Sequence, residues 1–356
     1  MVPAKNMATL DTMTMQALWQ MVVQPVQSIP GIAETARATR AALFAAHRHP
    51  AALRQPEHIT AESNLQGALY AARLQGFTDP VTSPQAATHP LLTAAVDSYS
   101  VLLSPPGGNL SRAATTGPLG IFAQLAVHAG GQRPPVDPRP TQESKSAGTY
   151  AVTPKQAPAV GNQSPAVAHP ASGLHDVTAS LGDPASAALT DAGDTQAVLA
   201  ADASSPSASD PAAALAQQTN QSAQLRGIPR AHQPVVQLAG QLLQSAPHAA
   251  AHRIDPLIIG AIVHGLLASS APFGSSSLLV ALPTVRVIHH LSGDDPLMMG
   301  VTERYLFDHQ QDYEALLLEF AASREAAGEF VALHLQAVTA GAADGRAIAD
   351  IARNHR

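Results

Sequence analysis

The sequence predicts an all-α fold, a helical bundle that one long disordered segment interrupts. Apolar residues recur at helical spacing in both outer parts of the 356-residue chain, and no stretch there shows the period-two alternation of a strand. Residues 132–226 between them are rich in Ala, Pro, Ser, Thr, Asp and Gln, with Tyr150 as the sole aromatic residue and no Ile or Met. A segment so poor in large apolar side chains cannot offset the entropy cost of ordering its backbone.

Composition divides the chain into five parts. A flexible N-terminus covers residues 1–17, and the disordered insertion covers residues 132–226. Two helical segments cover residues 18–131 and 227–345, and a tail covers residues 346–356. The two helical segments form either one domain of ordinary size or two small ones.

Charge and composition also limit the classes of partner. The net charge of −6 and the isoelectric point near 6.2 give no attraction to nucleic acid or to an anionic membrane. The absence of cysteine excludes disulfides, thiolate zinc sites and cysteine nucleophiles. Asp11, Thr12 and Gln16 interrupt the apolar stretch that a secretory signal needs, and no apolar run approaches the roughly 18 residues of a spanning helix. We therefore expect a cytoplasmic protein without nucleic-acid or membrane partners.

The first helical segment opens with an amphipathic helix over residues 29–47. Four residues at helical spacing form its apolar face: Ile32, Ala36, Thr39 and Leu43. The next helix, within residues 58–77, has Thr60 as its expected N-cap and Gly76 as its stop. Two further apolar helices are expected within residues 89–104 and 116–131.

The second helical segment contains the most apolar helix of the chain. Asp255 and Pro256 are an N-cap acceptor and a first-turn proline, so a helix is expected over residues 256–270. Its apolar residues lie on nearly every side, which suits only the middle of a bundle. Another helix follows over residues 278–293, and Pro283 is expected to weaken or kink it.

The last two expected helices begin at capping residues. Thr302 is expected to cap a helix over residues 302–320, and Ser323 caps the final helix, which Gly341 ends. Five residues share the apolar face of that final helix: Phe330, Leu333, His334, Ala337 and Val338.

Neither histidine pair, His47 with His49 or His289 with His290, has the HExxH pattern or clustered carboxylates of a metal site. We expect these four to be surface or helix-end residues. His264, inside the most apolar helix, is expected to be a core histidine with hydrogen bonds inside the bundle. Residues 294–295 (Asp-Asp) are expected to form a loop and cap.

A polar corner, SSAPFGSSS at residues 269–277, separates the two apolar helices of the second segment. The order of features around it resembles the Fic/Doc (Fido) family, whose members transfer AMP or related phosphate-containing groups from nucleotides to protein hydroxyls. The family motif, HPFxxGNGRxxR, falls here on Ala271, Pro272, Phe273, Gly274, Ser275, Ser276, Ser277, Leu278, Leu279 and Leu282. The upstream family histidine falls on His264, and a downstream Tyr-x-x-Leu falls on Tyr313 and Leu316.

The resemblance is closest to a divergent group from high-GC Gram-positive bacteria, in which the motif is eroded, and it covers residues 18–131 and 227–345. It implies that the catalytic histidine is replaced by Ala271, which has no proton acceptor, and that both motif arginines are replaced by leucine. The family's inhibitory helix falls on Gln75 and Gly76, with glutamine in place of glutamate. These two residues are alternatively a plain helix end. The hairpin that docks target chains in active relatives has no convincing counterpart within residues 132–226.

The resemblance predicts a degenerate Fic-like pseudoenzyme without AMP transferase activity, which acts as an interaction or regulatory module for an unknown protein partner and has no metal site. The loop Pro272–Ser277 is then a vestigial phosphate loop that could still turn N–H groups and hydroxyls towards an anion. The alternatives are a nucleotide-dependent transferase with altered active-site residues, using ATP with Mg²⁺, and an unrelated helical protein whose corner is an ordinary polar turn. In a Fic-like fold the corner faces a pocket lined by the helix that bears Gln75.

Overall fold

The structure is a computed structural model that describes residues 14–83, 85–103, 109–130 and 227–354. Within these residues every regular element is a helix and no strand occurs, which confirms the all-α prediction for the described part of the chain. The described residues on both sides of the insertion belong to one compact unit. The predicted disordered insertion and residues 1–13 of the predicted flexible N-terminus lie outside the described residues.

The helices of the first segment are interrupted mainly at prolines and glycines. They are α1 (Met15–Leu18), a π-helical turn (Trp19–Val23), α2 (Gln24–Gln27), α3 (Ile32–His47), α4 (Pro50–Arg54), α5 (Pro56–Leu74), α6 (Pro90–Ser100), α7 (Asn109–Thr116) and α8 (Pro118–His128). Single 3₁₀ turns cover Ala86–Thr88 and Val101–Leu103. Four of these helices, α4, α5, α6 and α8, begin with proline, which lacks the N–H group that would be unpaired there.

The helices of the second segment include the longest one. They are α10 (Gln233–Ala249), α11 (Pro256–Ser270), α12 (Ser277–Ser292), α13 (Thr302–Asp308), α14 (Gln310–Glu319) and α15 (Arg324–Asn354). Two 3₁₀ turns, Ala250–His252 and Gly274–Ser276, lead into the connections before α11 and α12. None of the described helices has both the length and the apolar character that a membrane span requires.

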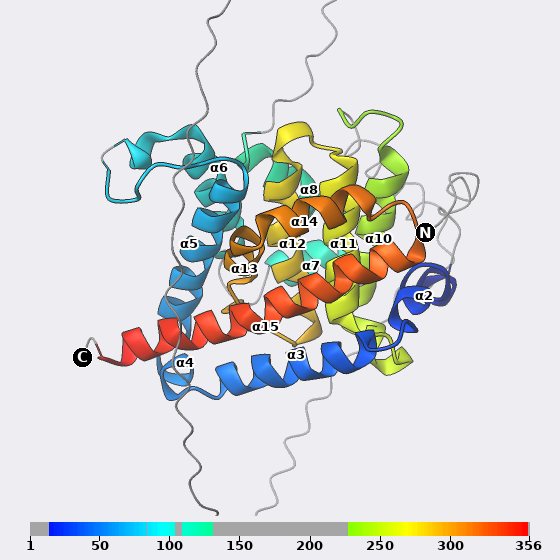
Figure 1. Cartoon of the computed structure of the whole chain (residues 1–356), viewed down its shortest axis with the longest axis horizontal. Helices are drawn as coiled ribbons and strands as arrows, with labels where there is room; N and C mark the ends of the chain where they lie inside the picture. Colours follow the sequence, from blue (N-terminus) through cyan, green and yellow to red (C-terminus); the bar gives the residue numbers. More distant parts are fainter. Residues whose placement is uncertain (1–13, 84, 104–108, 131–226, 355–356) are drawn as a thin grey trace, which may run out of the picture. The chain divides into compact units, whose positions relative to one another are not determined.

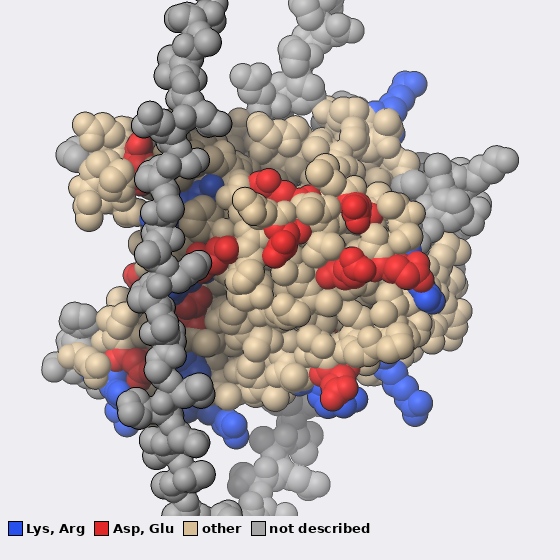
Figure 2. Space-filling model, viewed as in Figure 1, with Lys and Arg blue, Asp and Glu red and all other residues tan. Residues whose placement is uncertain are grey.

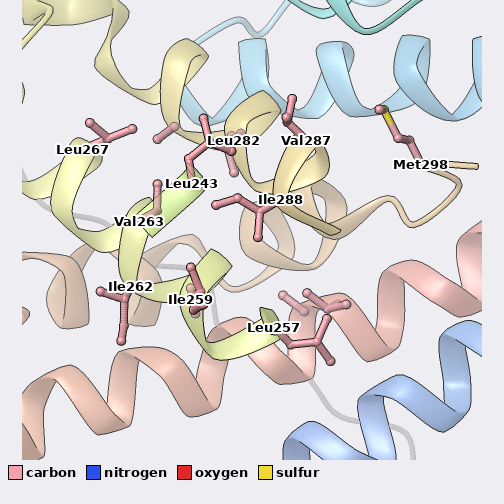
Figure 3. Close-up of a cluster of buried hydrophobic side chains, with 14 of the residues drawn as sticks. Leu243, Leu257, Ile259, Ile262, Val263, Leu267, Leu282, Val287, Ile288 and Met298 are labelled. Carbon is pink, nitrogen blue, oxygen red and sulfur yellow. The ribbon is translucent and has the colours of Figure 1, made fainter. Parts of the chain in front are cut away.

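Helix α11 lies in the middle of the unit, in contact with α10, α12 and α15 (Figure 1). The first twelve of its fifteen residues are buried, as its apolar sequence predicted. Asp255 caps this helix by accepting a hydrogen bond from the N–H of Leu257 at 3.0 Å, and Pro256 occupies the first turn. Figure 3 shows part of the core that α11 and α12 share, with Ile259 of α11 and Ile288 of α12 in it.

Helices α3 and α15 lie side by side (Figure 1). The four residues predicted to form the apolar face of α3 are all buried, and so are the five predicted for α15. Thr39 of α3 donates a hydrogen bond to the carbonyl oxygen of Leu335 at 3.1 Å, which links the two helices inside their contact. The first and second segments are therefore held together along these two helices.

One prediction for a single helix needs correction, and another concerns a proline inside a helix. Helix α5 starts at Pro56, so Thr60 is inside the helix and is not its N-cap. The Thr60 hydroxyl instead donates to the carbonyl oxygen of Leu297 at 2.8 Å. Helix α12 covers Ser277–Ser292 with Pro283 inside it, close to the predicted range of residues 278–293.

The C-terminal helices also differ from the prediction. Residues 302–320 form two helices, α13 and α14, and the side chain of Thr302 makes no capping hydrogen bond. Ser323 does cap α15, since its hydroxyl accepts from the N–H of Ala326 at 3.0 Å. Gly341 does not end this helix, which continues to Asn354 through most of the predicted tail. Gly341 is buried because the backbone of Val301 crosses α15 there, with its N–H donating to the Gly341 carbonyl at 3.1 Å.

Candidate functional site

The corner between α11 and α12 starts with a strained residue. Ala271 follows the last residue of α11 in the left-handed conformation, with φ 47° and ψ 49°, where glycine is usual. Its carbonyl oxygen accepts from the N–H of Gly274 at 3.0 Å, and Gly274 also has a positive φ of 60°. The chain thus reverses tightly, and the side chain at the position of the family histidine is an exposed methyl group.

Two of the three hydroxyls in Ser275–Ser277 are used by the fold itself. The hydroxyl of Ser277 accepts from the N–H of Phe273 at 2.9 Å, and the hydroxyl of Ser276 donates to the carbonyl of Ala129 at 3.3 Å. Both side chains are buried, whereas Ser275 is exposed. The Ser275 hydroxyl is therefore the exposed one of the three.

The end of α5 lies directly against this corner. Gln75 follows the last residue of α5, and its side-chain amide donates to the carbonyl oxygen of Ser275 at 3.0 Å. Gly76 then takes a positive φ of 96°, which suits glycine at a helix end. The stretch that matches the inhibitory helix and the stretch that matches the family motif are therefore in direct contact. Three cavities in the described residues are lined by other segments.

His264 is buried in α11 and joins two other helices. Its Nδ1 lies 3.1 Å from Nδ1 of His334 in α15, and its Nε2 lies 3.0 Å from the hydroxyl of Tyr313 in α14. Burial lowers the pKa of His264 to about 3, lowers the pKa of His334 and raises the pKa of Tyr313. The prediction of a hydrogen-bonded core histidine is confirmed, and two of the residues that match the family pattern, His264 and Tyr313, meet inside the core.

These contacts determine which proton chemistry the corner can support. The side chains of Ala271–Ser277 include no carboxylate or imidazole that could take a proton at neutral pH. His264 is fully buried inside α11, before the corner, and both of its ring nitrogens already have partners. The corner as built can offer N–H groups and one exposed hydroxyl to a ligand, but no general base.

Arg286 of α12 and Glu303 of α13 form a buried ion pair that the sequence analysis did not identify. Arg286 donates from Nε to Glu303 Oε1 at 2.8 Å and from Nη2 to Glu303 Oε2 at 2.7 Å. The hydroxyl of Tyr99 donates to the same carboxylate at 2.7 Å, and Asn64 accepts from the guanidinium at 3.2 Å. Burial opposes the charge of Arg286, yet Glu303 outweighs burial and raises the pKa of the guanidinium above its ordinary value.

This cluster joins helices α5, α6, α12 and α13, so its role is structural. Gly67 of α5 leaves the space that Arg286 and Tyr99 fill, because a Cβ atom there would lie 2.8 Å from the Tyr99 ring. The available sequence signal was a lone arginine within the otherwise apolar run LLVALPTVRVI, since a charge in such a helix needs a buried partner.

The two aspartates predicted as loop and cap lie in a connection, but they are buried and paired. Asp294 accepts from Nε of Arg40 at 2.6 Å. Asp295 lies 3.0 Å from Nε2 of His47 and accepts from the N–H groups of Met299 and Gly300. Burial alone would raise the pKa of Asp295, yet His47 and the two backbone N–H groups lower it.

The remaining histidines of the two pairs lie at helix ends, as expected. His49 caps α4 by accepting from the N–H of Ala51 at 3.2 Å, and His290 in the last turn of α12 lies 2.9 Å from the carbonyl of Pro296. His289 is buried in the same turn. Among the described residues, no group of three or more His, Cys, Asp or Glu side chains is placed to hold a metal ion.

Two open cavities lie away from the corner. One of about 310 Å³ lies where α2, α3 and the chain before α11 meet the end of α12, and one of about 570 Å³ borders α13 and α14.

Comparisons of this chain with protein-family models, with curated proteins and with solved structures find no match. The resemblance to the Fic/Doc family therefore depends on the residues quoted above.

Proposed function

We propose that this chain is a degenerate Fic-like helical protein that lacks AMP transferase activity and acts as a protein-interaction or regulatory module. The observation that supports this proposal is how the corner uses its polar groups. Ser276 and Ser277 turn their hydroxyls inward, and the carbonyl of Ser275 is bound by Gln75. The two hydroxyls that could have donated to a phosphate therefore hold the turn together, and the Gln75 amide ties this turn to the end of α5.

The missing general base adds a kinetic argument. In the family chemistry a histidine accepts the proton of the target hydroxyl, and Ala271 stands at that position. Loss of a general base costs about 10²- to 10⁴-fold in rate, and loss of the charge that stabilises the transferred phosphate adds about 10²- to 10³-fold. With Leu279 and Leu282 at the positions of the arginines, both losses apply to this chain.

The surface chemistry favours a partner with a basic and apolar segment. Exposed acidic residues gather over α13, α14 and the start of α15 (Figure 2): Asp308, Asp312, Glu314, Glu319, Glu325 and Glu329. The arginines there, Arg304 and Arg324, are already in ion pairs with acidic neighbours. Leu318 is 87% exposed between two of these acidic residues. A basic amphipathic helix matches this combination.

Calorimetric titration of the full chain with ATP and Mg²⁺ tests the loss of nucleotide chemistry. We expect no heat of binding at about millimolar nucleotide, which corresponds to less than about 4 kcal/mol of binding free energy. The matched variant is Ser275→Glu, which adds a negative charge at the exposed residue of the corner and leaves the inward hydroxyls intact. Micromolar binding that this variant abolishes would contradict the proposal and support the transferase with altered active-site residues.

Affinity capture from cell extract tests the interaction surface. The variant Asp312→Lys/Glu314→Lys reverses two exposed charges on α14, and Glu34→Lys/Glu57→Lys reverses two exposed charges on α3 and α5 as a control with the same net charge. We expect a partner that the wild type and the control retain and the α14 variant loses. Equal retention by all three proteins would exclude this face as the docking surface.

A further inference from the structure

An open cavity of about 310 Å³ lies at the end of the core opposite the corner. Its lining includes Gln27, Arg37, Arg40, Arg253, Asp255 and Asp294. The lining residues come from α2, α3, the connection between α10 and α11, and the end of α12. The fifteen residues of α11 separate the cavity from the corner by about 20 Å at 1.5 Å per residue.

Three arginines and two aspartates supply the charges of this cavity. Arg40 donates from Nη2 to Asp255 at 2.7 Å and from Nε to Asp294 at 2.6 Å, so it holds both carboxylates. The guanidinium groups of Arg37 and Arg253 are exposed and have no hydrogen bond or ion pair to any described residue. The cavity therefore keeps one net positive charge, with two arginines free to bind a ligand.

Arg253 occupies a backbone position where glycine is usual. Its φ is 62°, and the N–H groups of Arg253 and Ile254 bond back to the carbonyls of Ala250 and Ala249, which is the Schellman pattern of a helix end. A residue with a side chain is strained in this conformation, and such strain is found most often at functional sites. The turn alone would favour glycine at residue 253, so we attribute the presence of arginine there to a role of its side chain.

Gln27 fixes this turn in place. Its side-chain amide donates to the carbonyl of Arg253 at 2.9 Å and accepts from the N–H of Asp255 at 2.9 Å. These two bonds hold residues 253–255 against α2, so the backbone that carries the Arg253 guanidinium is fixed before any ligand binds. Arg37 lies three residues before Arg40 on α3, which places both on one side of that helix.

We propose that this cavity binds the phosphate group of a small ligand through Arg37 and Arg253. Guanidinium groups match the oxygens of phosphate by paired N–H donors. The carboxylates of Asp255 and Asp294 repel every anion in proportion to its charge, so charge alone does not select the ligand. A phosphate group has several oxygens on one atom, so both free guanidiniums can bind it at one point, whereas a dicarboxylate carries its two charges on separate groups. The volume is at the lower end of the range for ligand pockets, which restricts the ligand to a small molecule.

This inference goes beyond the proposed function, because it concerns another end of the core and holds whether or not the corner binds nucleotide. The test is calorimetric titration of the full chain with pyrophosphate, inorganic phosphate and succinate at one ionic strength. We expect pyrophosphate to bind with a dissociation constant below about 1 mM, and succinate to bind at least about tenfold more weakly. Absence of pyrophosphate binding up to about 10 mM, or equal binding of succinate, would overturn the assignment.

Three variants show whether binding occurs at this cavity. Arg37→Ala and Arg253→Gly should each weaken pyrophosphate binding about tenfold or more. Arg253→Gly also relieves the positive φ, so its thermal unfolding midpoint should not fall, and lost binding cannot then come from lost folding. Arg54→Ala removes an exposed arginine outside the cavity and should change nothing. Equal weakening by Arg54→Ala would show non-specific attraction to arginine and would contradict the proposal.

Discussion

Arg286 shows what a single buried charge contributes to this fold. The guanidinium has four hydrogen-bonded partner residues in the core, Glu303, Asn64, Met298 and Ser63, of which Glu303 is the charged one. The pair is a bidentate contact inside the protein, where the loss of one partner leaves an uncompensated charge. Its effect on stability therefore depends on whether one or both charges are removed.

We predict that Arg286→Met lowers the free energy of unfolding by about 3 to 5 kcal/mol, because Glu303 then remains buried without its counter-charge. The double variant Arg286→Met/Glu303→Leu should be less destabilised than the sum of the two single variants, since no buried charge remains. Urea denaturation of all four proteins measures both quantities. Additive effects would show that the two side chains act independently.

The sequence predicted single residues well where the relevant partners are implied by the local pattern. Asp255 as an N-cap and His264 as a core histidine both follow from their position in one apolar helix. Arg286 could not be placed, because its partners come from helices α5, α6 and α13, and their proximity depends on the folded chain. The same reason explains why Asp294 and Asp295 were expected only to form a loop and cap.

At the scale of helices, glycine was the ambiguous signal. Gly76 does end a helix, in the left-handed conformation that the prediction assumed. Gly341 does not, because it lies inside α15 where the chain around Val301 crosses the helix. A sequence shows both glycines alike, and the difference depends on which remote segment passes close to the helix.

We predict that Gly341→Ala destabilises the protein by about 1 to 3 kcal/mol, although alanine alone would favour the helix by about 1 kcal/mol. A Cβ atom at residue 341 would lie 2.7 Å from the backbone of Val301 and of Thr302, which cannot move aside as a side chain can. Thermal or urea unfolding gives the sign directly. A more stable variant would mean that the crossing at residue 341 is looser than the structure shows.

At the scale of the whole molecule, three buried histidines make the fold sensitive to acid. Burial lowers the pKa of His264 to about 3 and also lowers those of His289 and His334. Histidines of the unfolded chain take up protons near pH 6.5, whereas the lowered pKa values mean that these three take up protons in the folded state only at lower pH. Unfolding therefore takes up protons below pH 6.5, and acid shifts the equilibrium towards the unfolded chain.

We predict that the free energy of unfolding is highest above pH 6.5 and falls between pH 6 and pH 5 by at most about 1.4 kcal/mol for each histidine that stays neutral in the folded state. Urea denaturation at several pH values measures this slope. In the variant His334→Gln the slope should decrease by the contribution of one histidine, whatever its stability at pH 7. An unchanged slope would show that His334 does not contribute to the acid sensitivity.

The two described segments form one compact unit although about a hundred residues separate them in the sequence. Contacts between the segments hold this unit together, including α3 with α15 and α8 with α12. Composition predicted an insertion between the two segments, but it left open whether one domain or two would form, because that depends on contacts between remote segments. The insertion itself enters the free energy of folding at least as a loop that must be closed.

We predict that replacement of residues 132–226 by a flexible linker of about 20 residues raises the free energy of unfolding by about 1 kcal/mol, because a shorter loop costs less entropy to close. The expectation assumes, as the composition indicates, that the insertion adds no packing to the folded unit. Urea denaturation of the two proteins tests it, with a scrambled insertion of the same length as the control. A loss of stability on replacement, but not on scrambling, would contradict the expectation and show that the full length is needed to join the two segments. A loss in both would show that the insertion makes sequence-specific contacts with the unit.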